Sequence, residues 1–224
     1  MANYRAVASG NWNAGATWGG GAVPPNGAGH NIYSNTFTVT VDINVDVALV
    51  TNAVNAGTFV GGGTAAAGGG FTLSNGVTLT SNVTLGTPAT LVTLSSTNSA
   101  SIVGNITGNN NSNTSCVLNS GTGTLTVTGI ITGGSASISN FACNNSGNGT
   151  INVTGSIVGG SVNTTNFALA NSGIGSVTMT GSVTGGSASP GANNSSTGTF
   201  TVIGDITGTN GANGSGGTGG PSHV

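Results

Sequence analysis

The stretch T-L-T-V-T-G-I-I-T-G (124–133) returns along the chain as T-I-N-V-T-G-S-I-V-G (150–159) and as S-V-T-M-T-G-S-V-T-G (176–185). Shorter forms, S-I-V-G-N-I-T-G (101–108) and T-V-I-G-D-I-T-G (201–208), lie on either side. The shared glycines recur at intervals of 25, 26, 26 and 23 residues: Gly104, Gly129, Gly155, Gly181 and Gly204. A fixed period of this length is typical of solenoid proteins, in which each repeat forms one coil of a stack.

Aliphatic residues occupy fixed columns when the repeats are aligned on these glycines. Two residues after the glycine stand Val83, Ile106, Ile131, Ile157, Val183 and Ile206. Two before it stand Leu79, Ile102, Val127, Val153, Met179 and Val202, and four before it stand Val77, Ala100, Leu125, Ile151, Val177 and Phe200. Ser81 takes the place of the glycine in the first of these repeats, and we assign Thr58 to that place one coil earlier. Period-two alternation around a turn residue predicts short strands joined by bends. We therefore predict an all-β protein, a parallel β-solenoid (β-helix) with coils of about 23–26 residues.

The columns between the aliphatic ones are polar, and we expect them to face solvent. The candidate surface ladder is Thr126, Thr128, Asn152, Thr154, Thr178, Thr180 and Thr201. A second polar column recurs largely in the turn sequence N-S-G and is predicted to form another surface ladder: Asn119, Asn145, Asn171 and Asn194. Asparagines stacked in this way can form hydrogen bonds from coil to coil and tolerate left-handed backbone.

Both ends of the repeat array differ from it in composition. Residues 1–35 contain Trp12 and Trp18, and we predict that they form a capping or attachment region over the first coil, because a stack exposes open strand edges. The solenoid is assigned to residues 36–208. Residues 209–224 form a Gly-rich tail that lacks the apolar residues for a packed cap, so we expect it to be flexible or ordered by a partner.

Charge is nearly absent from the chain, which has one Lys or Arg and three acidic residues among 224. A nucleic-acid-binding surface needs a basic stripe, and so does attachment to anionic lipid, so we expect neither partner. No apolar run reaches the roughly 20 residues that span a bilayer, and the first residues lack the apolar core of a secretion signal. We expect synthesis in the cytoplasm and exit by another route, such as release with a particle.

Catalytic and metal-binding groups are also scarce, so we expect no enzyme activity, no cofactor and no metal. Asp42 and Asp46 lie four residues apart, which in one extended strand places them about 13 Å apart, too far for the two carboxyl groups of a glycosidase. His30 is isolated in sequence and is expected to be exposed. Cys116 and Cys143 fall at adjacent column positions and are not expected to form a disulfide; Cys143 shares the column of Val117 and reads as a small core residue.

The chain opens with G-N-W-N-A-G-A-T-W-G-G-G-A-V-P-P (10–25), followed by G-H-N-I-Y-S (29–34) and T-V-T-V-D (38–42). This opening resembles the N-terminal entry of β-helical surface proteins of bacteriophage virions, including cyanophage-type tail and fibre proteins. Related openings often carry acidic residues where this chain has N-G-A-G-H-N (26–31), so no acidic site is implied here. The resemblance implies a structural or adhesive virion component, often trimeric in fibres, and identifies no catalytic residue.

We therefore expect a non-enzymatic phage virion protein: a fibre, a tail-associated adhesin or a capsid decoration. Its expected location is the virion surface, and its expected partners are other virion proteins, further copies of itself in a trimer, and a host-surface glycan. Two alternatives stay open. The Thr-x-Thr rows suit an ice-binding β-solenoid, although Asn152 and Ile203 interrupt them. A polysaccharide-degrading tailspike would need a site shared between subunits.

Overall fold

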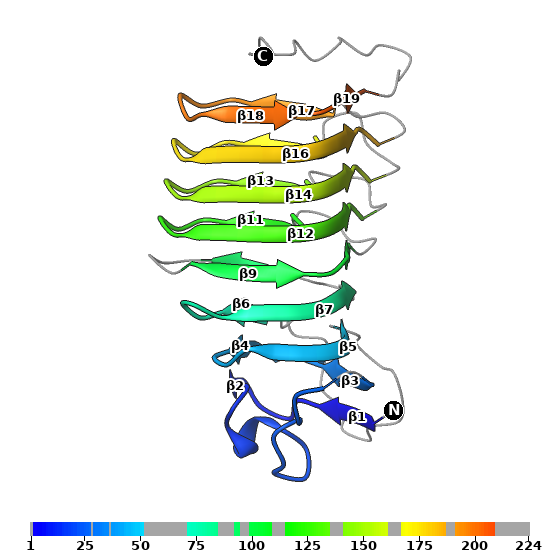
Figure 1. The fold of residues 1–224 in the computed structure, drawn as a ribbon. Helices are drawn as coiled ribbons and strands as arrows, with labels where there is room; N and C mark the ends of the chain where they lie inside the picture. The colour runs from blue at the N-terminus through cyan, green and yellow to red at the C-terminus, as the bar shows by residue number, and fades with distance from the viewer. Residues whose placement is uncertain are drawn as a thin grey trace, which may run out of the picture.

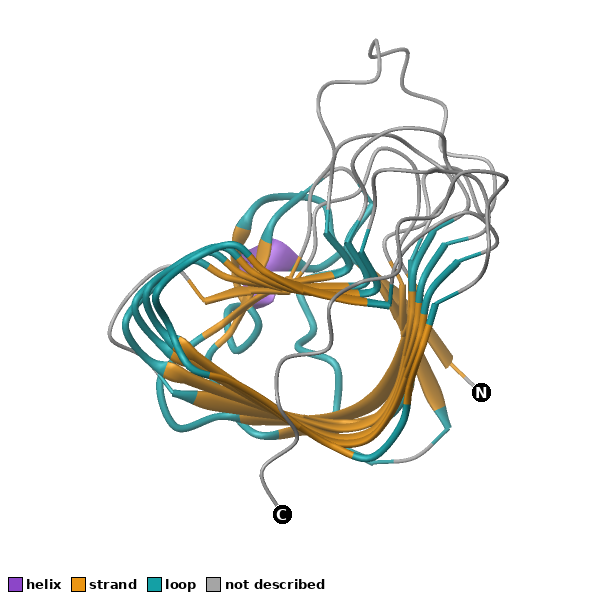
Figure 2. Cartoon of the chain, turned by 90° about the horizontal axis from the view of Figure 1, so that it is seen from above, coloured by secondary structure: helices purple, strands orange, loops and turns teal. Residues whose placement is uncertain are grey.

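The computed structural model of the chain describes residues 2–27, 29–35, 37–51, 71–84, 92–94, 99–108, 115–134, 141–160, 167–186 and 191–208. They form a stack of coils with the N-terminal residues at one end and β17–β19 at the other (Figure 1). Viewed along the stack, the strands superpose in two sheets that enclose a common interior (Figure 2). The predicted parallel β-solenoid is therefore confirmed.

The larger sheet has eleven strands among the described residues, all paired in parallel. In chain order they are β1 (Ala2–Arg5), β3 (His30–Tyr33), β5 (Val45–Thr51), β7 (Thr78–Thr84), β9 (Ala100–Val103), β10 (Ile106–Thr107), β12 (Thr124–Thr132), β14 (Thr150–Val158), β16 (Ser176–Thr184), β18 (Phe200–Ile203) and β19 (Ile206–Thr207).

The smaller sheet has eight shorter strands within the same described ranges, and these too pair in parallel. They are β2 (Gly10–Asn11), β4 (Val39–Val41), β6 (Phe71–Leu73), β8 (Val92–Leu94), β11 (Val117–Asn119), β13 (Cys143–Asn145), β15 (Leu169–Asn171) and β17 (Ala192–Asn194). The single helix of the described chain, η1, is a 3-10 turn over Gly15–Thr17.

The strand register reproduces the sequence columns. Ile131 pairs with Ile157, and Ile157 pairs with Val183. All three side chains are completely buried, as are most others in the aliphatic columns. A continuous core follows because every coil buries its apolar residues against the coils above and below rather than alone.

The glycine column forms a bend in the long strands of the larger sheet. Gly129, Gly155 and Gly181 have φ angles of +147°, +141° and +130°, which L side chains rarely adopt. A Cβ placed on Gly155 would also overlap the carbonyl oxygen of Gly129 in the preceding coil. Glycine is required at these positions for two reasons, the backbone conformation and the close approach of two coils.

Turn amides form hydrogen bonds from coil to coil as well. The N–H of Gly27 donates to the carbonyl oxygen of Asp46 over 2.7 Å, and the N–H of Gly76 donates to that of Ser99 over 2.7 Å. The N–H of Gly149 donates to the carbonyl oxygen of Gly121 over 2.8 Å. These bonds satisfy backbone groups that strand pairing leaves over at the turns.

The N-terminal coils depart from the predicted repeat. Thr58 lies outside the described residues, and the place opposite Ser81 belongs to β5, where the register shifts between Asp46 and Leu49. Register partners lie 34 residues apart from Val45 to Leu79, against 23 from Leu79 to Ile102. The coil length of 23–26 residues thus holds only from β7 onwards, because earlier turns differ in length.

Residues 1–35 provide strands as well as a cover for the end of the stack, since β1 and β3 pair within the larger sheet. Trp12 and Trp18 are each 1% exposed, and their rings meet edge to face at 5.1 Å. The indole N–H of Trp18 donates to the carbonyl oxygen of Trp12 over 2.7 Å. Both tryptophans therefore cap the core, and neither is accessible for attachment to a partner.

The last described coil leaves its core residues uncovered. Ile206 is 44% exposed, whereas Val183, its partner in the preceding coil, is completely buried. Phe200 and Val202 are half-buried, although their partners Val177 and Met179 are completely buried. The predicted tail, residues 209–224, lies outside the described residues.

Candidate functional site

The outward side of strands β9, β12, β14, β16 and β18 carries a regular array of small uncharged side chains, which we call the hydroxyl face. Its members are Ser101, Val103, Thr124, Thr126, Thr128, Thr150, Asn152, Thr154, Ser176, Thr178, Thr180, Thr201 and Ile203. Thr128, Thr154, Thr180 and Thr201 are exposed, and Thr126, Asn152 and Thr178 are half-buried. The predicted Thr ladder thus lies on the surface, with a spacing of about 4.8 Å between coils.

The asparagine column lies inside the solenoid, so the prediction of a second surface ladder is wrong. Asn119, Asn145 and Asn171 are completely buried, and only Asn194, in the last coil, is exposed. Each of the three buried asparagines follows a buried residue by two positions in a short strand, and such residues share a face. This alternation, present in the sequence, was the signal for an inward position.

The buried asparagines hold turns and join coils. The side-chain amide of Asn145 donates to the carbonyl oxygen of Gly149 over 3.0 Å and to Asn171 Oδ1 over 3.1 Å. Asn171 repeats this with Gly175 over 3.1 Å and with Asn194 Oδ1 over 3.3 Å. The predicted hydrogen bonds along the axis are confirmed, but the column stabilises the fold and does not contact solvent.

Most charged groups of the described chain lie away from the hydroxyl face, and the exception is Asp205, which is exposed in the bend after Ile203 in the last described coil. The Arg5 guanidinium sits 4.4 Å from the centre of the Tyr33 ring. Asp42 follows β4 and accepts a hydrogen bond from the Asn13 N–H over 3.0 Å, whereas Asp46 lies in β5 of the other sheet. The chain turns between these two aspartates, so the prediction of one extended segment is wrong.

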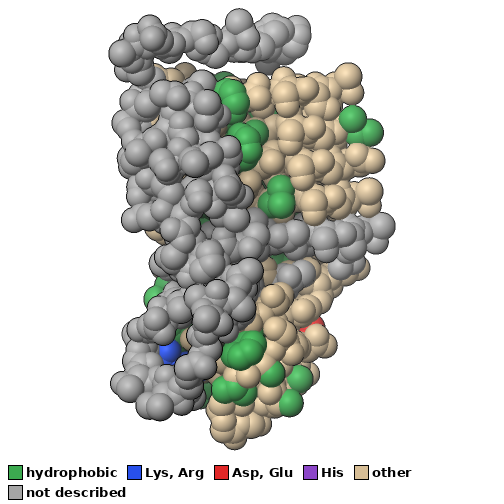
Figure 3. Space-filling model, turned by 180° about the vertical axis from the view of Figure 1, so that it is seen from behind, with side chains coloured by type: hydrophobic (Ala, Val, Ile, Leu, Met, Phe, Trp, Pro, Cys, Tyr) green, Lys and Arg blue, Asp and Glu red, His purple; other side chains and the backbone are tan. Residues whose placement is uncertain are grey.

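No group of three or more His, Cys, Asp or Glu that could bind a metal occurs among the residues that the structure describes. His30 is half-buried rather than exposed, because the Tyr4 ring packs edge-on against it at 5.6 Å. On the side opposite to Figure 1, the described surface is again mainly uncharged, and the few charged side chains lie towards the N-terminal end (Figure 3).

The two cysteines are buried free thiols, and Cys143 is a core residue as predicted. Burial raises the pKa of the Cys116 thiol from 9.0 to about 11, and a hydrogen bond from the Gly134 backbone opposes this change. Burial also raises the pKa of Cys143, to which Cys116 adds a smaller effect. Neither thiol is accessible as a nucleophile.

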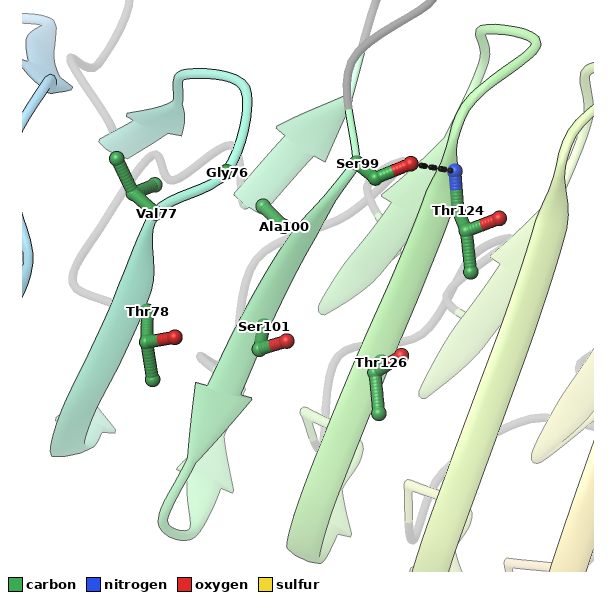
Figure 4. Close-up of a pocket in the computed structure, with 8 residues that line it drawn as sticks. All are labelled: Gly76, Val77, Thr78, Ser99, Ala100, Ser101, Thr124 and Thr126. Carbon is green, nitrogen blue, oxygen red and sulfur yellow. Dashed lines mark hydrogen bonds between the residues drawn. The ribbon is translucent and has the colours of Figure 1, made fainter.

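A shallow groove crosses β7, β9 and β12 at the edge of the hydroxyl face (Figure 4). Thr78, Ser101 and Thr126 form one row of hydroxyls across the three strands, and Ser99 and Thr124 form a second row with Gly76. The Thr124 N–H donates to Ser99 Oγ over 3.1 Å, a bond drawn in Figure 4. The groove was not predicted from the sequence.

Small residues account for this groove. Gly76 occupies the column of Ser99 and Thr124, and Ala100 occupies the inward column of Val77 and Leu125. A Cβ built on Gly76 meets nothing within 4 Å, so space is open beside it. The sequence did contain a signal, because Gly76 and Ala100 are the smallest members of their columns.

No described helix has the length and apolar character needed to cross a bilayer. Comparisons of the chain with protein-family models, with curated proteins and with solved structures gave no significant match.

Proposed function

We propose that the protein is a non-enzymatic structural or adhesive component that uses the hydroxyl face to contact another subunit or a glycan-covered surface. The observation that carries the proposal is the uncharged array of Thr, Ser and Asn on five neighbouring strands. Each hydroxyl can donate and accept a hydrogen bond, and each such bond contributes about 0.5–1.5 kcal/mol net. Affinity would therefore come from many weak contacts repeated along the face.

The hydroxyl face is suited to a rigid partner because it moves as part of the core. Thr154 lies between Val153 and Gly155 on β14, and β14 pairs along its full length with β12 and β16. Little conformational entropy is lost when such a face binds, since the strands already fix its side chains. The lack of charge predicts binding that hardly changes with salt.

The test places charge within the hydroxyl face. Thr154→Lys and Thr180→Lys both alter exposed positions and should leave the fold intact. Adsorption to surfaces coated with bacterial envelope polysaccharide, and self-association measured by light scattering, should be lost in the double variant. Thr122 is exposed on the turn before β12, so Thr122→Lys serves as the control. Unchanged adsorption and unchanged self-association in the double variant would refute a role for the face.

A phage virion is the setting that we propose, as a fibre, tail-associated adhesin or capsid decoration, with trimers as the favoured oligomer. This part of the proposal depends on the resemblance of residues 10–42. Mass spectrometry and antibody labelling of purified particles test it directly. Absence of the protein from the particles would remove the virion setting without affecting the proposed role of the face.

Ice binding is a second candidate, favoured by the exact register of Thr128, Thr154 and Thr180 in one exposed column. Two neighbouring columns of this kind form a two-dimensional grid of hydroxyl and methyl groups. Val103 and Ile203 end the column on either side and keep its methyl groups while lacking hydroxyls. Thermal hysteresis of the purified protein would support this candidate, and freezing at the buffer's ordinary temperature would exclude it.

A further inference from the structure

We infer that the groove over β7, β9 and β12 is a binding subsite for an uncharged carbohydrate unit. This inference rests on the proposed function and assigns one position on that surface. Gly76 and Ala100 leave a hollow on this surface, whereas larger residues occupy the equivalent columns in later coils.

The hydroxyls beside this hollow are available to a ligand. Within the described part of the chain, Thr78, Ser101 and Thr126 use their side-chain hydroxyls in no hydrogen bond. In the adjacent column, by contrast, Ser99 Oγ accepts from the Thr124 N–H over 3.1 Å, and further along it Thr150 and Ser176 bond to each other over 2.9 Å. The groove therefore offers one column of hydroxyls as donors and acceptors for a ligand, beside a column in which hydroxyls already have protein partners.

The chemistry of the lining defines the class of ligand. All the polar side chains that line the groove are hydroxyls, so none can neutralise a phosphate, sulfate or carboxylate. A carbohydrate unit presents hydroxyls that donate and accept in the same way. Two strand spacings, about 10 Å, separate Thr78 from Thr126, which leaves room for a short stretch of a glycan chain.

The affinity of the subsite should be low. No aromatic side chain lines the groove, so the stacking surface that strengthens many sugar contacts is missing. A few neutral hydrogen bonds at an open site correspond to dissociation constants on the order of millimolar. The subsite would act through repetition, because copies of the protein arranged on one surface engage many units of a polymer.

Saturation-transfer NMR with neutral maltohexaose, cellohexaose and laminarihexaose, and with acidic hexagalacturonate, tests the inference. At least one neutral hexasaccharide should receive saturation from the protein, and the acidic one should not bind more tightly. Ser101→Tyr, which fills the groove from its half-buried outer position, should abolish the signal. Thr178→Tyr, in the same column three coils away, should retain it.

A smaller change removes one hydroxyl and keeps the shape. Thr126→Val should weaken binding by about 2- to 12-fold, which corresponds to the loss of one neutral hydrogen bond. Thr178→Val is the matched control and should bind as the unaltered protein does. Circular dichroism of each variant must show an unchanged fold.

Three results would overturn the inference: no binding of any neutral hexasaccharide, full binding by Ser101→Tyr, or equal loss in Thr178→Tyr. These results are distinguishable from failure of the proposed function. If Ser101→Tyr binds normally while the variant with Thr154→Lys and Thr180→Lys loses adsorption, the hydroxyl face is the binding surface and the groove is not its subsite.

Discussion

Replacement of Gly155 by alanine is the sharpest test of how the coils stack. The φ angle of +141° costs a residue with a Cβ about 1–3 kcal/mol. The new methyl also overlaps the Gly129 carbonyl, so relief requires the coils to separate and to weaken two or three hydrogen bonds of about 1 kcal/mol each. Reduced entropy of the unfolded chain returns about 0.4–1 kcal/mol. The net loss in the free energy of unfolding is about 2–5 kcal/mol.

Thermal unfolding followed by circular dichroism measures this loss as a fall in Tm of about 5–15 °C. Gly27→Ala is the matched control, because Gly27 has a φ of +144° but a Cβ there meets nothing within 4 Å. The control variant therefore has the backbone strain without the overlap, and its Tm should fall by less. The reasoning would be refuted if Gly155→Ala melted within about 2 °C of the unaltered protein, or no lower than Gly27→Ala.

Three further predictions concern the interior. Asn145→Ala should lower the free energy of unfolding by about 1–3 kcal/mol in denaturant titrations, because the Gly149 carbonyl and Asn171 Oδ1 lose a buried donor. By the same method, Ile157→Ala should lower the free energy of unfolding by about 2–5 kcal/mol, because Ile157 is completely buried. Ile206→Ala should lower it by less than half as much, because Ile206 is 44% exposed. The raised pKa values of Cys116 and Cys143 keep both thiols protonated in the folded state, so their contribution to stability should be constant well below pH 9.0 and should fall as the pH rises through 9.0 towards about 11. Unfolding at pH 8 and pH 10.5 tests this, and replacement of both cysteines by alanine should remove their part of the slope.

The repeat region was predictable because the same physical demand recurs in every coil. Apolar residues two apart around a fixed glycine leave one register that buries them all, and the observed pairing of Val127 with Val153 and of Gly129 with Gly155 follows it. The Thr ladder followed from the same alternation. Polarity alone misplaces the asparagine column, because Asn145 lies on the same face as Cys143. Its side-chain N–H groups offset part of the desolvation cost by bonding to a turn and to the next coil, whereas its Oδ1 is buried without a partner among the described residues.

The N-terminal coils were less predictable, because turn lengths vary there and no column can be aligned. β5 joins the sheet with a register shift, and its neighbour β7 lies beyond residues 52–70, which are outside the described chain. The groove exists because the side chains at Gly76 and Ala100 are small. A small residue indicates a hollow only when the positions of the neighbouring coils are known, and the sequence does not give those positions.

The coil-to-coil hydrogen bonds of the turn glycines bear on chemical ageing. Asn–Gly pairs are prone to deamidation, because the glycine nitrogen attacks the asparagine side chain to form a cyclic imide that water then opens. Three such pairs in the described chain, at 26–27, 75–76 and 148–149, hold the glycine N–H in a hydrogen bond to another coil. The nitrogen cannot reach the side-chain carbon without breaking that bond. The stacking of coils that shapes the surface should thus also slow deamidation at these three pairs.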